Sequence, residues 1–142
     1  MEKVNVAFLS LGSNLGDRES QITQAIEAMS AHHINLIANS SFFYSEPMGF
    51  DSENHFCNAC AKVTTMLDPL MLLERLKCIE QEFGRTKKSI NQNYEDRVID
   101  IDLIFYNKIS LQSTELTLPH PEWNKRPFVY RPLLELVESL NI

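Results

Sequence analysis

The stretch from Val98 to Phe105 reads VIDIDLIF, and its alternation of apolar and acidic residues predicts a β-strand with two unlike faces. Side chains alternate along a strand, so the apolar residues at every second position are expected to face the core. Asp100 and Asp102 are expected on the opposite face. The expected core residues are Ile99, Ile101, Leu103 and Phe105.

The segments before this strand read as a mixture of strands and helices, and they predict the sheet that the strand joins. The second helix among them is expected to follow the cap Asp68, to begin at Pro69 and to end at Gly84. Its expected buried stripe is Leu70, Leu73, Leu76, Ile79 and Phe83. In chain order the segments are a strand at 4–10, a helix capped by Asp17 with an apolar stripe at 22–29, strands within 34–44 and at 58–65, and the helix over 69–83.

The resulting order, βαββαβ, predicts a ferredoxin-like fold of the α+β class, in which an antiparallel sheet carries two helices on one face. A C-terminal hairpin is expected after a short turn at Asn107-Lys108, and a short helix is expected around 133–140. The length of 142 residues suits a single domain over 1–142. The fold by itself indicates no function, because many unrelated activities use it.

Composition argues against several functional classes. With 13 Lys and Arg against 19 Asp and Glu, the net charge is −6, which disfavours general nucleic-acid binding, since that depends on phosphate neutralisation by cations. No apolar run approaches the roughly 18 residues of a membrane span, and no secretion signal is recognisable. The three cysteines make a disulfide framework unexpected, and Cys57 and Cys60 are expected to be buried rather than to bind zinc. We therefore expect a cytoplasmic protein without nucleic-acid or membrane partners.

The acid pair Asp100 and Asp102 is the sharpest chemical feature. The two side chains are about 7 Å apart along the strand and repel each other unless a cation lies between them. An edge strand with a polar outer face is the alternative for any isolated Asp-x-Asp. No basic residue stands between or directly beside the two acids, so the pair favours a Mg²⁺ site. Protein-bound Mg²⁺ usually also contacts phosphate, so a phosphate-bearing ligand is expected.

Two basic clusters could neutralise such a ligand, although solvated loops are the alternative for both. The chain has no Gly-x-x-x-x-Gly-Lys-Ser/Thr motif, so a P-loop is excluded, and residues 12–17 favour a strand-to-helix turn over a phosphate cradle. The first cluster holds Arg85, Lys87, Lys88 and Arg97, and the second holds Lys125, Arg126 and Arg131.

Aromatic residues and one histidine could complete a ligand site. Phe56 and Phe128 could form a slot for a flat heterocycle whose edge Asn58 reads, although core packing is the alternative for both rings. His120 lies between two prolines. It could contact phosphate or metal, or it could only belong to a rigid surface turn.

Short motifs in one continuous order carry a family resemblance. They are Leu11–Asp17, Ser41–Tyr44, Glu46–Gly49, Phe56–Ala59, Ile79–Glu80, Gly84–Arg85, Arg97–Ile104, Leu118–Pro121, Arg126–Val129 and Arg131–Leu133. Together they resemble the 6-hydroxymethyl-7,8-dihydropterin pyrophosphokinase family of folate biosynthesis. One segment departs from that family, because Tyr94-Glu95-Asp96 stands where Trp-Gly-Pro is usual.

The resemblance implies transfer of the β,γ-diphosphate of ATP to the hydroxymethyl group of the dihydropterin, with release of AMP. It implies two Mg²⁺ ions on Asp100 and Asp102, catalytic roles for this pair and for Arg85 and Arg97, and a monomer whose partners are ATP and the pterin. The implied pterin contacts are Ser45, Met48, Gly49, Phe56, Asn58, Asp100 and Phe128. The implied ATP contacts are Glu80, Arg85, Lys88, Arg97, Asp102, Leu103, Thr117, His120 and Arg126.

Other functions are alternatives on the same fold. A nucleotide-binding regulatory module would bind ATP without catalysis. An RNA-binding module would present aromatic and basic residues on its central strands, whereas the strand over 98–105 presents two acids. An Asp-x-Asp glycosyltransferase would use the same metal chemistry but normally needs a larger domain.

Overall fold

The computed structural model confirms the predicted antiparallel α+β fold. It describes residues 4–45, 55–85 and 98–139. The strands are β1 (Asn5–Ser13), β2 (Ile34–Asn39), β3 (Phe43–Ser45), β4 (Phe56–Thr65) and β5 (Asp100–Tyr106). Their order in the sheet is β2-β4-β1-β5, every pairing is antiparallel, and β3 also pairs with β4. This is the ferredoxin-like arrangement, with β1 between β4 and β5.

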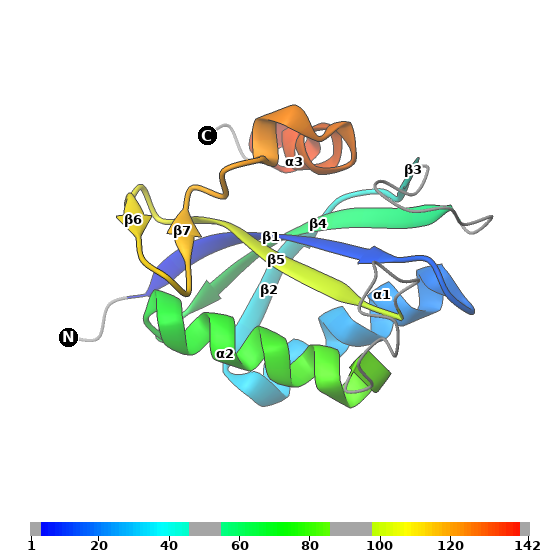
Figure 1. Cartoon of the computed structure of the whole chain (residues 1–142), viewed down its shortest axis with the longest axis horizontal. Coiled ribbons are helices and arrows are strands. Elements are labelled where there is room, and N and C mark those ends of the chain that lie inside the picture. Colours follow the sequence, from blue (N-terminus) through cyan, green and yellow to red (C-terminus); the bar gives the residue numbers. More distant parts are fainter. Residues whose placement is uncertain (1–3, 46–54, 86–97, 140–142) are drawn as a thin grey trace.

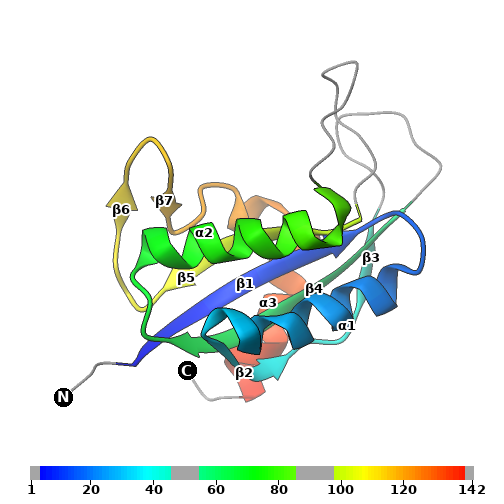
Figure 2. The same ribbon diagram turned by 90° about the horizontal axis from the view of Figure 1, so that it is seen from below.

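Two helices cover one face of the sheet, as predicted (Figures 1 and 2). They are α1 (Arg18–Ala28), continued by a 3-10 turn η1 (Met29–His32), and α2 (Pro69–Glu80), continued by a π-helical turn η2 (Gln81–Arg85). The predicted caps Asp17 and Asp68 each accept a hydrogen bond from a first-turn backbone N–H. The helix α2 ends before the predicted Gly84, because its last residues widen into the π turn.

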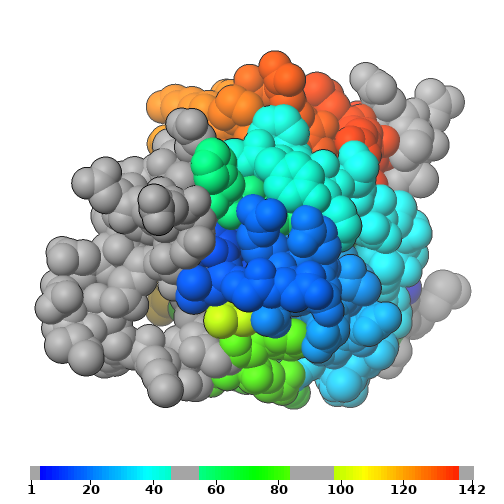
Figure 3. Space-filling view, turned by 90° about the vertical axis from the view of Figure 1, so that its right-hand side faces the viewer, coloured from blue at the N-terminus to red at the C-terminus, as the bar shows by residue number. Residues whose placement is uncertain are grey.

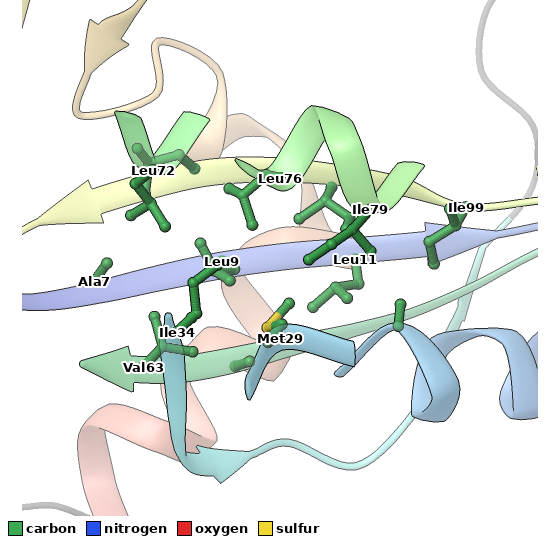
Figure 4. Close-up of a cluster of buried hydrophobic side chains, with 14 of the residues drawn as sticks. Ala7, Leu9, Leu11, Met29, Ile34, Val63, Leu72, Leu76, Ile79 and Ile99 are labelled. Atoms are coloured by element: carbon green, nitrogen blue, oxygen red, sulfur yellow. The ribbon is translucent and has the colours of Figure 1, made fainter. Parts of the chain in front are cut away.

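The core beneath these helices is built around β1 (Figure 4). Leu9 and Leu11 of β1 point toward Leu72, Leu76 and Ile79 of α2, and all five side chains are fully buried. Burial of each such side chain contributes roughly 1.5–3 kcal/mol to stability. This layer fixes the central strand against α2.

The buried stripe of α2 differs in part from the prediction. Leu70 is 47% exposed, whereas Leu72, which the predicted stripe left out, is 0% exposed. Leu73 is only partly buried. A leucine-rich helix offers two stripes with nearly the same spacing, and the position of the sheet decides which of them faces inward.

A third helix, α3 (Pro127–Ser139), covers the opposite face of the sheet, where it packs on β4, β3 and β1 (Figure 1). It is longer than the short helix expected around 133–140, because it begins with Pro127, a residue that suits the first helical position. A second, smaller core lies beneath it. The buried residues of this core are Cys60, Ile104, Val129, Leu133 and Leu136.

The strand β5 contains a bulge that corrects one prediction. Phe8 pairs with Phe105 and Leu9 pairs with Leu103, so Ile104 is an extra residue without its own partner on β1. The alternation therefore breaks, and Phe105 packs in the second core instead of facing the helices with Leu103. Asp100 lies ahead of the bulge, so the predicted faces of the acid pair are unaffected.

The predicted C-terminal hairpin is present as β6 (Leu111–Gln112) and β7 (Thr117–Leu118), followed by a 3-10 turn η3 (Trp123–Lys125). After β7 the chain returns to the sheet, where the backbone N–H of His120 donates a 3.0 Å hydrogen bond to the carbonyl of Ile104. This contact fixes the hairpin beside β5. In the described ranges, no helix combines the length and the apolarity that crossing a membrane would require.

We expect Leu76→Ala to destabilise the fold by about 2–5 kcal/mol, because it removes a fully buried side chain and leaves a cavity. Urea denaturation followed by far-UV circular dichroism measures this loss. The matched control is Leu70→Ala in the same helix, where the side chain is 47% exposed. Equal destabilisation by both substitutions would contradict the inward orientation of α2.

Candidate active site

Two rows of residues cross the sheet on the face that α3 partly covers. Gly12 of β1 lies opposite both Asn58 of β4 and Asp100 of β5. Two residues before Gly12, and on the same face of β1, Ser10 lies opposite Asp102. Adjacent strands are roughly 4.8 Å apart, so the backbones at Asn58 and Asp100 stand about 10 Å apart across a residue without a side chain. The sheet therefore offers a small, flat floor between an amide and a carboxylate.

Gly12 is a site residue that the sequence reasoning missed. A Cβ at Gly12 would lie 2.8 Å from Asn58 Oδ1 and 3.5 Å from Phe56 Cδ1. Residues 12–17 were expected to form a turn, but Gly12 belongs to β1, and Gly16 in the turn that follows has a positive φ of 66°. A glycine inside a strand signals close approach of another group, and that signal could have found it.

Asn58 is held in place by β3. It is 3% exposed, and its Nδ2 donates hydrogen bonds to Ser45 Oγ at 3.0 Å and to the carbonyl of Phe43 at 3.4 Å. These two bonds use the donor end of the amide and direct Oδ1 over Gly12. The amide oxygen can thus accept a hydrogen bond from the edge of a flat ligand.

The acid pair has the predicted geometry. Asp100 and Asp102 lie on the same face of β5, while Ile101 between them is buried in the larger core. The backbone N–H of Ile101 donates a 2.7 Å hydrogen bond to Glu80 Oε2. Glu80, a predicted nucleotide contact, therefore holds the strand that carries the pair, and its contact with nucleotide stays a prediction.

The donor set of this pair suits Mg²⁺, because carboxylate oxygens are its preferred protein ligands. Within the described residues, no group of three or more His, Cys, Asp or Glu side chains could hold a metal. A Mg²⁺ ion on Asp100 and Asp102 would also take water and phosphate as ligands, as this ion usually does.

A pocket of about 280 Å³ opens beside Asp102, between α2, β5 and the β6–β7 hairpin. Its lining includes four of the predicted nucleotide contacts: Asp102, Leu103, Thr117 and His120. Sequence reasoning missed the other walls, among them Leu73, Leu116 and residues 113–115. They come from segments far apart in the chain, and only the folded hairpin brings them together.

His120 is poised as a neutral hydrogen-bond donor. Its Nδ1 accepts a 3.1 Å hydrogen bond from the backbone N–H of Glu122, so a neutral ring carries its proton on Nε2. Burial lowers the pKa of His120 below the ordinary value, and the nearby Arg126 cation lowers it further. The ring can donate to a phosphate oxygen without a charge of its own.

The two predicted aromatic residues reach this face from different elements. Phe56 begins β4, and Phe128 lies in the first turn of α3, where Arg126 Cζ is 5.9 Å from its ring centroid. Phe128 also packs against the second core. The slot between the two rings stays a prediction. Figure 3 faces this end of the molecule, where the start of β4 (green), the start of β5 (yellow) and the start of α1 (blue) reach the surface below α3 (orange).

Several predicted site residues fall outside the described part of the chain. They are Met48, Gly49, Lys88 and Arg97, and the departing segment Tyr94–Asp96 falls there too. Arg85 is the last residue of the π turn that follows α2. The roles of these residues stay predictions.

The burial of two cysteines agrees with the prediction from the sequence. Cys57 and Cys60 are free and buried. Burial raises the pKa of Cys57 to about 11 and the pKa of Cys60 to about 12, so neither thiol forms a reactive thiolate near neutral pH.

Two carboxylates beside a pocket suit a Mg²⁺ ion shared with a phosphate-bearing ligand, which is the arrangement that phosphoryl-transfer enzymes use. The family model of 7,8-dihydro-6-hydroxymethylpterin-pyrophosphokinase (HPPK) matches residues 8–138. The chain belongs to this family.

Curated relatives agree with that assignment. The chain is 41% identical over 137 residues to a 2-amino-4-hydroxy-6-hydroxymethyldihydropteridine pyrophosphokinase of Porphyromonas gingivalis, covering 96% of this chain and 93% of the relative. It is 33% identical over 137 residues to the Bacillus subtilis protein of the same name, covering 96% and 80%. The chain thus spans most of the length of these relatives.

Among solved structures, an HPPK-DHPS crystallised in complex with substrates matches with a TM-score of 0.70 and 16% identity. The match covers 95% of this chain but only 40% of that longer one. At this identity the likeness supports the fold and nothing finer.

We expect Gly12→Ala to lower the free energy of unfolding by about 1–3 kcal/mol, because the added methyl displaces the buried Asn58 amide from its partners. Urea denaturation measures the loss. In an Asn58→Ala background the same substitution should cost clearly less, since the clashing oxygen is gone. An equal cost in both backgrounds would show that the glycine matters for another reason.

Proposed function

We propose that this chain transfers the β,γ-diphosphate of ATP to the hydroxymethyl group of 6-hydroxymethyl-7,8-dihydropterin and releases AMP. The observation that carries the proposal is the pocket that Asp102 shares with Thr117 and His120. The family match points to the same reaction. We also propose that residues 1–142 act as one domain and as a monomer.

In this proposal the base and ribose of ATP occupy the pocket, and the phosphates extend along the acid pair. His120 donates its Nε2–H to a phosphate oxygen, and Arg126 supplies positive charge beside it. Arg85, Lys88 and Arg97 are the further proposed phosphate contacts, which would come from the segment that follows α2.

The pterin is proposed to lie over Gly12. Asn58 Oδ1 would accept a hydrogen bond from the ring edge, and Asp100 would stand at the opposite side of the floor. Phe56 and Phe128 would cover the two faces of the ring. Ser45, which orients the Asn58 amide, completes this side together with the proposed contacts Met48 and Gly49.

In the reaction, the pterin hydroxyl oxygen forms a bond to the β-phosphorus while the bond from that phosphorus to the AMP oxygen breaks. The hydroxyl proton passes to water. Mg²⁺ bound at Asp100 and Asp102 would neutralise charge on the phosphates. The side chains position the two substrates and stabilise charge, as phosphoryl transfer asks of a protein. We assign no side chain as an obligatory general base.

The alternative is a regulatory module that binds ATP in the same pocket without catalysis. It would bind ATP with the same pocket residues but would have no need for a second ligand over Gly12. The product that the chain makes from ATP separates the two functions.

We expect purified protein, given ATP, Mg²⁺ and 6-hydroxymethyl-7,8-dihydropterin, to produce AMP only when the pterin is present. Asp102→Asn should lower the rate by at least about 100-fold, because it removes a charge that holds the metal and the phosphates. Chromatographic separation of AMP, ADP and ATP measures the outcome. The matched control is Asp68→Asn, which removes the same charge but keeps a competent helix cap.

Other products would redirect the proposal. ADP in place of AMP would mean attack at the γ-phosphorus and a different kinase. ATP binding without any turnover would favour the regulatory module.

A further inference from the structure

The link between β2 and β3, residues 40–42, is bound to β4 through Ser40. The backbone N–H of Ser40 donates to the carbonyl of Cys60 at 2.8 Å, and the backbone N–H of Cys60 donates to Ser40 Oγ at 2.8 Å. Ser40 is 5% exposed. The reciprocal pair fixes this link on the sheet, although it lies outside any regular strand.

The next residue binds α3. The Ser41 hydroxyl donates a 2.6 Å hydrogen bond to Glu135 Oε2, and the Ser41 backbone N–H donates a 2.9 Å bond to Glu135 Oε1. Both carboxylate oxygens are engaged by one residue, and both bonds are assisted by the negative charge. These bonds hold the pKa of Glu135 below its ordinary value. In Figure 3 the cyan surface of β2 and β3 lies against the orange and red surface of α3.

On one side this contact holds α3, which carries Phe128 in its first turn. Residues 128 and 135 are seven apart and lie on the same side of a helix. Pro132 has no N–H, so it cannot donate to the carbonyl of Phe128 as a normal helical residue would. The first turn is therefore less supported by its own helix and depends more on contacts between α3 and the sheet.

On the other side the contact holds β3. Two residues after Ser41, the carbonyl of Phe43 accepts a hydrogen bond from Asn58 Nδ2, and Ser45 Oγ accepts another. The segment that orients Asn58 and the helix that carries Phe128 are thus joined at Ser41 and Glu135. In the proposed function these are two walls of one pterin site.

We infer that Ser41 and Glu135 are positioning residues for the pterin, because their paired hydrogen bonds set the Phe128 wall relative to the Asn58 wall. The inference rests on the proposed function and extends it to residues that touch no substrate. The pocket beside Asp102 has its walls on α2, β5 and the β6–β7 hairpin. Loss of the Ser41–Glu135 contact should therefore affect the pterin more than ATP, because no residue of α3 lines the pocket proposed for the base and ribose.

The test compares Ser41→Ala, Glu135→Ala, Glu135→Gln and the double alanine variant in steady-state assays. Each alanine variant should raise the KM for the pterin by about three- to tenfold and leave the KM for ATP within about twofold. Glu135→Gln should fall between wild type and Glu135→Ala, since an amide oxygen still accepts one of the two bonds. The double variant should be no worse than the poorer single one.

Glu27→Gln on α1 is the matched control, because it removes the same charge from an exposed helical residue. It should leave both KM values unchanged. A second readout needs no turnover. The single tryptophan, Trp123, lies just before α3 and meets Phe105 edge to face, with ring centroids 5.0 Å apart, so quenching of its emission by the pterin gives a dissociation constant.

Unchanged pterin KM and dissociation constant in all variants would overturn the inference while leaving the proposed function intact. An equal rise of both KM values would also overturn it, since that is the result of general damage. A wild-type protein that neither makes AMP nor binds the pterin would overturn the proposed function itself, and this inference with it.

Discussion

The pairing of β1 with both β4 and β5 is the constraint on which the rest of the structure depends. Its register decides which residues of the neighbouring strands meet on each face. On one face of the sheet lie the apolar residues that α1 and α2 cover. On the other face, Asn58 and Asp100 lie on either side of Gly12. A slip of one residue would exchange the two faces. The same ladder of hydrogen bonds therefore selects both the core and the candidate site.

Local patterns predicted the elements where each pattern depends only on its own segment. The predicted alternation from Ile99 to Leu103 was right, because the apolar residues point toward the helices α1 and α2 and the residues between them point toward the other face of the sheet. It failed at Phe105, because the bulge at Ile104 is a property of the pairing with β1 and not of β5 alone. The helix α3 is longer than predicted, because apolar spacing alone does not mark where a helix begins, whereas Pro127 does.

The candidate site was predicted as residue types, and its geometry came only from the fold. Thr117 and His120 line a pocket with Asp102 because the hairpin folds back onto β5. No spacing along the chain encodes that return. Gly12 was missed because it was assigned to a turn, and the cross-strand approach of Asn58 becomes visible only once Gly12 belongs to β1. Residues whose role lies in a non-local contact are those that a single sequence reveals least.

The acid pair is where stability and function oppose each other. Two carboxylates about 7 Å apart repel by roughly 0.6 kcal/mol in water and about 2 kcal/mol at an effective dielectric constant of 20. Glu80 adds a third carboxylate at the backbone of Ile101. β5 tolerates this because its other face is buried in the larger core, where each apolar side chain contributes roughly 1.5–3 kcal/mol. The fold can thus hold two carboxylates in a fixed place for a metal ion, and such preorganisation is what electrostatic catalysis requires.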